Sequence, residues 1–142
     1  MTMKSLHLLL VEDDDVDLMA MQRGLRELRL ANPVTVAHDG IEALEILRGE
    51  KGHTKLERPF VILLDLKMPR MDGLEFLAAI RGDDDLRDSV VFVLTTSRHD
   101  EDIAAAYKQN IAGYILKETL AEQFVTLITL LDAYWRIVEL PG

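Results

Sequence analysis

Residues Phe60 to Asp65 read FVILLD, five apolar residues followed directly by a carboxylate. A run without polar alternation is typical of a central parallel strand that is covered on both faces. A carboxylate immediately after such a strand is costly to bury unless it is paired or has a role. The run therefore predicts a layered α/β protein with a functional aspartate at the end of a central strand.

Other short apolar runs along the chain alternate with segments of helical period. Strands are predicted at Leu6–Val11, Val34–Ala37, Phe60–Leu64, Val90–Leu94 and within Ile111–Leu116. Helices are predicted at 14–30, Ile41–Arg48, Leu74–Arg81, Asp100–Asn110 and Leu120–Val138. This order predicts a flavodoxin-like (βα)5 doubly wound sandwich, with a parallel five-stranded sheet in the order 2-1-3-4-5.

The first predicted helix has Leu18, Met21 and Leu25 on one face, and Asp14 or Asp15 is placed to cap its start. Met19 and Met21 are both interpreted as core residues. The polar segment Gly49–Pro59 is predicted to be a long loop.

The chain has 142 residues, which predicts one domain over 1–142, with a core at 6–138, a tail at 139–142 and no output domain. A net charge of −9 argues against nucleic acid and anionic membranes as partners. The absence of cysteine excludes disulfides and thiolate sites. No apolar run is long enough for a bilayer and no signal pattern begins the chain, so we expect a cytoplasmic protein.

Charged and hydroxyl side chains follow the predicted strands, where parallel strands place ligand sites. They are Glu12, Asp13, Asp65, Thr95 and Lys117. Two carboxylates about 4 Å apart repel by roughly 4 kcal/mol at an effective dielectric near 20, so three need a cation or protonation. Oxygen ligands favour Mg²⁺. A lysine and a hydroxyl beside that ion indicate a site for phosphoryl chemistry.

At these residues the chain resembles the receiver domain of two-component response regulators. The resemblance rests on four separated motifs in the same order as in the family: Val11-Glu12-Asp13-Asp14, Leu64-Asp65-Leu66-Lys67-Met68-Pro69-Arg70-Met71-Asp72-Gly73, Leu94-Thr95-Thr96-Ser97 and Gly113-Tyr114-Ile115-Leu116-Lys117. It covers almost the whole chain. It implies a phosphoacceptor switch with at most slow self-dephosphorylation rather than an enzyme with turnover.

The resemblance implies a role for each residue of these motifs. Asp65 would accept a phosphoryl group from a sensor histidine kinase, and Lys117 and Thr95 would contact its oxygens. Mg²⁺ would be held by three carboxylates and one backbone carbonyl: Glu12, Asp13, Asp65 and the carbonyl of Lys67. Thr95 and Tyr114 would form the switch, and Lys67 and Ser97 would tune the lifetime of the phosphoryl group.

Two residues depart from the family pattern. Glu118 follows Lys117, where the family often has a proline, usually after a cis peptide bond. A cis bond before another residue costs about 2.5–4 kcal/mol, so we expect a differently built turn. Glu12 stands where aspartate is commoner, and it still supplies a carboxylate.

The last predicted helix carries more apolar residues than one buried face needs. Those expected at a dimer or partner interface are Phe124, Tyr134, Trp135, Val138 and Leu140. The aromatic pair near the C-terminus and the loop at Gly49–Pro59 are similar to small response regulators that work with bacterial and cyanobacterial phytochromes. This similarity implies a phytochrome as the kinase, a homodimer and a downstream protein partner.

Three other functions compete with a phosphoacceptor switch. A flavin carrier of this fold needs a phosphate-cradling loop, whereas the acidic segment Glu12–Asp15 repels phosphate. A pseudo-receiver, an interaction module that works without phosphorylation, would be indicated by loss of Asp65 or Lys117, and both are present. A phosphatase needs a second acid/base carboxylate, and Asp72 is expected instead to stabilise the turn before a helix.

Overall fold

The computed structural model describes the backbone of residues 6–27, 32–117 and 120–141, and their side chains except those of 120–125, 135 and 136. Strands and helices alternate along the chain. The strands are β1 (His7–Val11), β2 (Val34–Ala37), β3 (Phe60–Leu64), β4 (Val90–Thr95) and β5 (Gly113–Leu116). The helices are α1 (Asp15–Glu27), α2 (Gly40–Arg48), α3 (Gly73–Arg81), α4 (Asp100–Lys108) and α5 (Leu120–Ile137).

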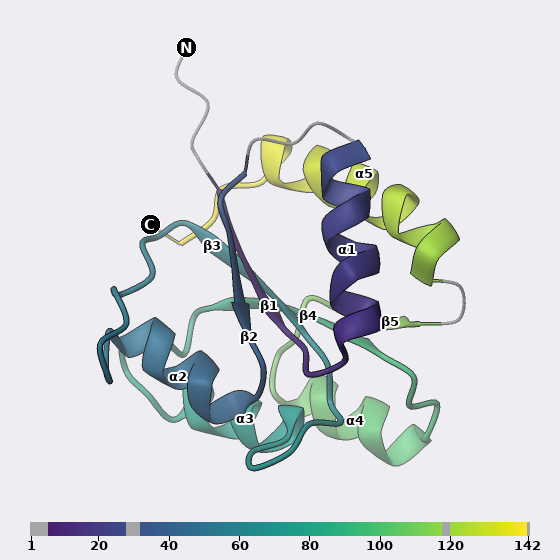
Figure 1. Cartoon of the computed structure of the whole chain (residues 1–142). Coiled ribbons are helices and arrows are strands. Elements are labelled where there is room, and N and C mark those ends of the chain that lie inside the picture. Colours follow the sequence, from purple (N-terminus) through teal and green to yellow (C-terminus); the bar gives the residue numbers. More distant parts are fainter. Residues whose placement is uncertain (1–5, 28–31, 118–119, 142) are drawn as a thin grey trace.

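The strands form one parallel sheet in the order β2-β1-β3-β4-β5, which confirms the predicted topology. Figure 1 shows α1 and α5 packed together on one face of this sheet, with α2, α3 and α4 on the other. Every residue of β3 is buried, as its uniformly apolar sequence predicts for a central strand. The predicted end of the first helix at Leu30 lies outside the described residues.

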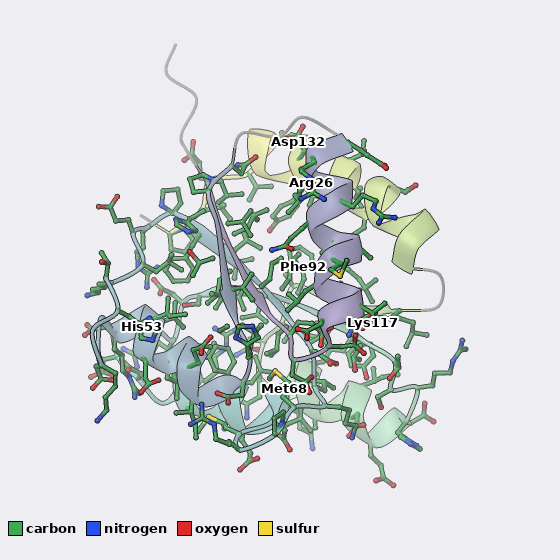
Figure 2. All side chains as sticks on the ribbon, viewed as in Figure 1. Arg26, His53, Met68, Phe92, Lys117 and Asp132 are labelled. Atoms are coloured by element: carbon green, nitrogen blue, oxygen red, sulfur yellow. The ribbon has the colours of Figure 1, made fainter. Side chains whose placement is uncertain are left out.

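Two apolar layers fill the space between the sheet and its helices (Figure 2). On the α1 and α5 side, Leu18, Met21 and Leu25 pack with Ile128 and Leu131. On the other side, the buried residues include Leu44, Leu47, Phe76, Ile80 and Ala106. The sheet is therefore covered on both faces, as a doubly wound fold requires.

The prediction that Met19 belongs to the core was wrong. Met21 is buried, but Met19 is 60% exposed. Met21 shares a helix face with Leu18 and Leu25, at steps of three and four residues, whereas Met19 points away from that face. Asp14 is the residue that caps this helix, because its carboxylate accepts hydrogen bonds from the N–H groups of Val16 and Asp17 at 2.9 and 3.1 Å.

The long loop between α2 and β3 begins where Gly49 ends α2 in the left-handed conformation, with φ of +71°. The N–H of Gly49 donates to the carbonyls of Glu45 and Ile46 in the last turn of that helix. The loop ends at a cis bond between Arg58 and Pro59. This segment lies at the amino end of β3, away from the end that Asp65 follows.

Candidate functional site

The register of the sheet brings the carboxyl ends of β1 and β3 side by side. Val11 is the partner of Leu64, so the next residues along each strand, Glu12 and Asp65, leave the sheet at the same level. The N–H of Asp65 donates to the carbonyl of Val11 at 3.0 Å, which continues the ladder one step further. Two carboxylates distant in sequence therefore share one edge of the sheet.

Glu12, Asp13 and Asp65 form one acidic cluster at this edge. Each offers a carboxylate oxygen, and these oxygens all lie within 4.8 Å of one another. Glu12 and Asp65 are buried, while Asp13 is exposed to solvent. A set of oxygen donors with one open side fits a hard divalent cation such as Mg²⁺, which keeps several of its waters. The residues present therefore suit the metal that the sequence predicts.

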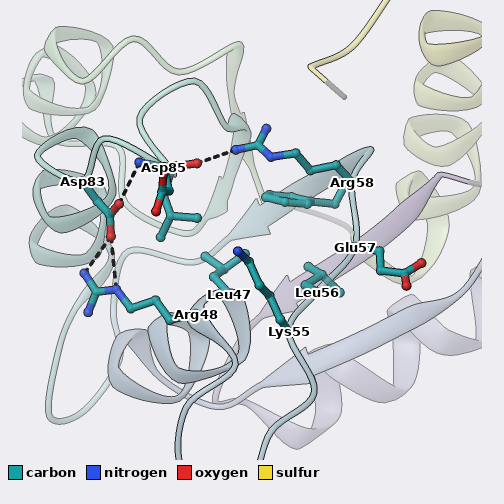
Figure 3. A pocket seen from close by; sticks show the side chains of 10 residues that line it. Leu47, Arg48, Lys55, Leu56, Glu57, Arg58, Asp83 and Asp85 are labelled. Carbon is teal, nitrogen blue, oxygen red and sulfur yellow. Dashed lines mark hydrogen bonds and ion pairs between the residues drawn. The ribbon is translucent and has the colours of Figure 1, made fainter.

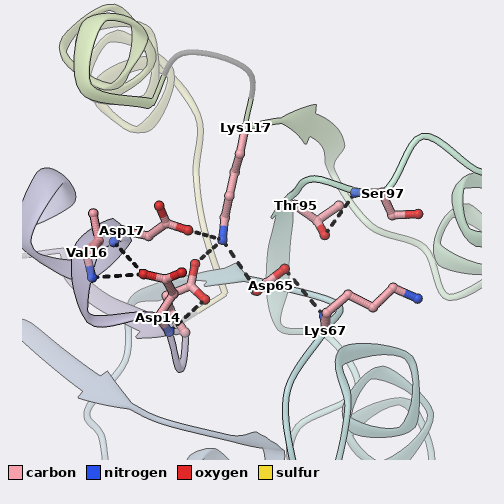
Figure 4. A network of polar contacts seen from close by, with 9 residues as sticks. Asp14, Val16, Asp17, Asp65, Lys67, Thr95, Ser97 and Lys117 are labelled. Atoms are coloured by element: carbon pink, nitrogen blue, oxygen red, sulfur yellow. Dashed lines mark hydrogen bonds and ion pairs between the residues drawn. The ribbon is translucent and has the colours of Figure 1, made fainter.

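Lys117 directs its ammonium group into this cluster. Its side chain is only 4% exposed, and Nζ contacts the carboxylates of Glu12, Asp17 at 2.8 Å and Asp65 at 3.4 Å (Figure 4). Burial lowers the pKa of Lys117, but its hydrogen bonds to Asp17 and Glu12, together with the negative charges of Asp65 and Glu12, raise the pKa overall. The group therefore stays a cation beside Asp65.

Glu12 is the buried member of the cluster that faces both Lys117 and Asp65. Burial, together with the neighbouring Asp65 carboxyl, raises the pKa of Glu12 to about 8, and the hydrogen bond from Lys117 opposes this shift. Several carboxylates around one ammonium leave an excess of negative charge in a buried place. A divalent cation would relieve this excess, which is a second reason why the cluster suits one.

Thr95 and Ser97 lie beside the acidic cluster at the end of β4. Thr95 is fully buried, and its hydroxyl accepts a hydrogen bond from the N–H of Ser97 at 3.5 Å. The hydroxyl of Ser97 donates to Asp102 on α4 at 2.5 Å. This bond lowers the pKa of Asp102 and fixes the loop between β4 and α4 to the first turn of the helix.

Lys67 and Tyr114 both contact the segment from Ser97 to Asp102, which comprises the loop after β4 and the start of α4. The ammonium of Lys67 lies 3.4 Å from Asp102, and the backbone N–H of Lys67 donates to Asp65 at 3.4 Å. The hydroxyl of Tyr114 donates to the carbonyl of Ser97 at 2.8 Å. Lys67, Ser97 and Tyr114 are thus linked through this segment, although they come from three separate motifs.

A second contact fixes the loop between β3 and α3, which carries Lys67. Nε of Arg70 donates to Asp39 at 2.6 Å, and the N–H of Gly40 donates to the carbonyl of Met71 at 3.1 Å. Asp39 also caps α2 by accepting from the N–H of Glu42 at 2.8 Å. The loop beside the acidic cluster is therefore held to the start of α2.

Sequence reasoning missed four residues of this region: Asp17, Asp39, Arg70 and Asp102. Asp17 lies in the first turn of α1, and the other acidic residues of this helix face solvent, so nothing in its spacing distinguished it. Asp39 precedes a glycine and a helical period, which is a capping signal and could have been used. For Arg70 and Asp102, no sequence signal specifies the partner.

The predicted interface residues are placed as follows. Tyr134 is half-buried, with its ring edge against Phe92 at 5.7 Å between centroids. Leu140 packs against the apolar layer on the α5 side, and Val138 is exposed. The side chains of Phe124 and Trp135, and residue Glu118, lie outside the described residues.

An open pocket of about 650 Å³ lies at the opposite end of the sheet from the acidic cluster. Its walls come from the end of α2, the long loop before β3 and the segment after α3, and include Arg48, Lys55, Arg58 and Asp83 (Figure 3). Arg58 also lies over the ring of Phe60. Because Phe60 begins β3 and Asp65 follows its end, this pocket is separate from the site described above.

Within the parts of the chain that the structure describes, no helix combines the length and the apolar composition that a membrane crossing needs.

The chain matches the family model described as the response regulator receiver domain over residues 8–129. It is 32% identical over 136 residues to response regulator Rcp1 of Synechocystis sp., covering 95% of this chain and 92% of that protein.

Two solved structures are similar throughout. The phosphorylated cyanobacterial phytochrome response regulator RcpA superposes with a TM-score of 0.86 at 34% identity, covering 96% of this chain and 98% of that one. The Mn²⁺-bound form of Rcp1 superposes with a TM-score of 0.84 at 31% identity, covering 96% and 99%. The chain therefore belongs to the response regulator receiver domain family, and it is related to the phytochrome response regulators within it.

Proposed function

We propose that this response regulator accepts a phosphoryl group from a sensor histidine kinase onto Asp65. The observation that carries the proposal is the contact between the Asp65 carboxylate and the buried Lys117 ammonium at 3.4 Å, inside a cluster suited to a divalent cation. Mg²⁺ would be held by Glu12, Asp13, Asp65 and the backbone carbonyl of Lys67. When bound, Mg²⁺ neutralises charge on the phosphoryl oxygens.

In the transfer, an oxygen of Asp65 attacks phosphorus while the bond from phosphorus to the imidazole nitrogen of the kinase breaks. The electron pair of the broken bond stays on that nitrogen, and the imidazole is released. Lys117 holds a positive charge where negative charge accumulates on the phosphoryl oxygens, and the Thr95 hydroxyl can donate to one of them. Lys117 needs no reorganisation for this, because it already faces Asp65.

Phosphorylation would be transmitted through the loop after β4. Thr95 moving toward the phosphoryl group would shift Ser97, whose carbonyl holds the hydroxyl of Tyr114. Thr95 and Tyr114 then act as the switch, and Lys67 and Ser97 set the lifetime of the phosphoryl group through their contacts with Asp102. This is a local charge change acting on a two-state element.

The partners of this switch are proposed from the relatives. Similarity to RcpA, a cyanobacterial phytochrome response regulator, supports a phytochrome as the kinase. A downstream protein or a second copy of the chain would bind the α5 side, where Leu130, Ile137 and Val138 are exposed. The domain would then act as a phosphoacceptor switch with at most slow self-dephosphorylation.

The test is intact mass after incubation with phosphoramidate, in Mg²⁺ and in chelator, over a short time course. We expect one added phosphoryl group in Mg²⁺, none in chelator and none in Asp65→Asn. Asp84→Asn, on the exposed loop after α3, is the control and should be labelled like the wild type. Label persisting in Asp65→Asn would contradict the assignment, and a folded wild type without any adduct would indicate an interaction module that works without phosphorylation.

A further inference from the structure

Asp17 is a third carboxylate at the ammonium group of Lys117, and it comes from a helix rather than from a strand end. Its Oδ2 lies 2.8 Å from Nζ, closer than the carboxylate of Asp65 at 3.4 Å (Figure 4). The contact joins residues 100 positions apart in the chain. A charge-assisted hydrogen bond to an ammonium that is 4% exposed is stronger than an ion pair at the surface.

The place of Asp17 is fixed by the start of α1. Its own N–H donates to the capping carboxylate of Asp14 at 3.1 Å, so the residue lies in the first turn of a capped helix. Its side chain is 26% exposed, and its carboxylate accepts the hydrogen bond from Lys117. The acceptor is therefore held in position before any ligand arrives.

Asp17 differs from Glu12 because it does not belong to the acidic cluster. The carboxylate oxygens that lie within 4.8 Å of one another come from Glu12, Asp13 and Asp65. Glu12 therefore contacts the Lys117 ammonium and would also be a ligand of any divalent ion held by the cluster. A divalent ion on Glu12 would weaken the hold of that carboxylate on Lys117 and would repel the ammonium.

We propose that Asp17 is a positioning residue for Lys117, holding the ammonium beside Asp65 while the acidic cluster is occupied by a divalent cation. The inference rests on the proposed function and deepens it. The carboxylate of Asp17 lies outside the cluster, so a cation bound there leaves its hydrogen bond to Lys117 in place. Lys117 then remains aimed at the oxygens of the incoming phosphoryl group.

The test compares the rate of phosphorylation by phosphoramidate with the affinity for Mg²⁺, measured by calorimetry, in four proteins. They are the wild type, Asp17→Asn, Asp17→Glu and Asp15→Asn. Asp15→Asn removes the same charge from the same helical turn at an exposed position. We expect Asp17→Asn to lower the rate at saturating Mg²⁺ about tenfold, with the Mg²⁺ affinity changed less than about threefold.

We expect Asp17→Glu to recover most of the rate, because a carboxylate is restored, and Asp15→Asn to match the wild type. An unchanged rate in Asp17→Asn, or an equal loss in Asp15→Asn, overturns the inference, since the latter would reveal only a long-range charge effect. If the wild type itself takes no phosphoryl group, the proposed function fails, which is a different result.

A measurement on the wild type alone keeps the inference testable if Asp17→Asn does not fold. The ammonium resonance of Lys117 can be followed by ¹H–¹⁵N correlation spectroscopy as Mg²⁺ is added. We expect the resonance to stay in slow exchange with water at saturating Mg²⁺, because Asp17 still holds the group. Loss of the resonance on Mg²⁺ binding would show that the ammonium is released, and would overturn the proposal.

Discussion

At the scale of the residue, Gly73 shows how closely α3 packs against the segment that follows β3. The N–H of Gly73 donates to the carbonyl of Leu66 at 3.0 Å. A Cβ on Gly73 would lie 2.5 Å from the carbonyl oxygen of Asp65 and 2.7 Å from the Cα of Leu66. Both neighbours are backbone atoms and cannot rotate away. The first turn of α3 can therefore approach the site only because this position lacks a side chain.

Gly73→Ala should reduce the free energy of unfolding by about 1–3 kcal/mol, the usual cost of overpacking. It should also slow phosphorylation, because relief of the clash moves the backbone of Asp65. Urea denaturation and labelling by phosphoramidate measure the two effects.

The matched control for Gly73→Ala is Gly82→Ala, at the other end of the same helix. There the nearest atom to an added Cβ is the carbonyl oxygen of Ala78, at 3.5 Å, so the change should stay within about 0.5 kcal/mol. Equal effects at both positions would contradict the role given to close packing at Gly73.

At the scale of the element, α3 begins with a complete capping box. The carboxylate of Asp72 accepts from the N–H of Glu75 at 2.9 Å, and the carboxylate of Glu75 accepts from the N–H of Asp72 at 3.2 Å. These two bonds satisfy N–H groups that the first turn of a helix otherwise leaves free. The carboxylate of Asp72 is engaged in this cap, as the sequence-based assignment of Asp72 to the turn anticipates.

Asp72→Ala should destabilise the fold by about 1 kcal/mol, since it removes the cap of α3. Asp72→Ser keeps a capping oxygen and should lose less than half of that amount. Urea denaturation at neutral pH measures both, and phosphorylation of Asp65 should persist in each variant. A complete loss of phosphorylation in the folded Asp72→Ser protein would contradict a purely structural role.

At the scale of the whole molecule, the two faces of the sheet are covered unequally. Helices α2, α3 and α4 cover one face, whereas α1 and α5 pack together over the other (Figure 1). On α5, Leu130 and Ile137 remain 66% and 82% exposed although Ile128 and Leu131 of the same helix are buried. Solvent-exposed apolar residues on a helix whose other face is already packed into the core indicate an interface with another protein or with a second copy of the chain.

If α5 forms a homodimer, Leu130→Glu and Ile137→Glu should each raise the dissociation constant about tenfold or more. Sedimentation velocity over a range of protein concentrations measures the change. Val16→Glu on α1 is the control, because Val16 is also an apolar residue that is 75% exposed but it lies on another helix. An unchanged sedimentation profile in both α5 variants would remove the α5 dimer from the proposal.

Much of this molecule could be predicted from local sequence. Apolar runs such as Phe60–Leu64 define buried strands, and helical periods such as that of Leu18, Met21 and Leu25 define the faces that cover them. Parallel strands then place the residues after β1 and β3 at one edge, which is why the acidic cluster was anticipated. Each of these inferences depends on near neighbours in the chain and on general rules of chain connection.

Pairing between distant side chains was decided only by the tertiary structure. Asp17 and Lys117 lie 100 positions apart, and neither the charge nor the spacing of Asp17 distinguishes it from Asp15 beside it. The same holds for Asp102 with Lys67 and for Asp39 with Arg70. The physical reason is that such contacts depend on the angle and register at which whole helices and loops pack against one another. The local sequence pattern of a helix or strand does not determine those angles.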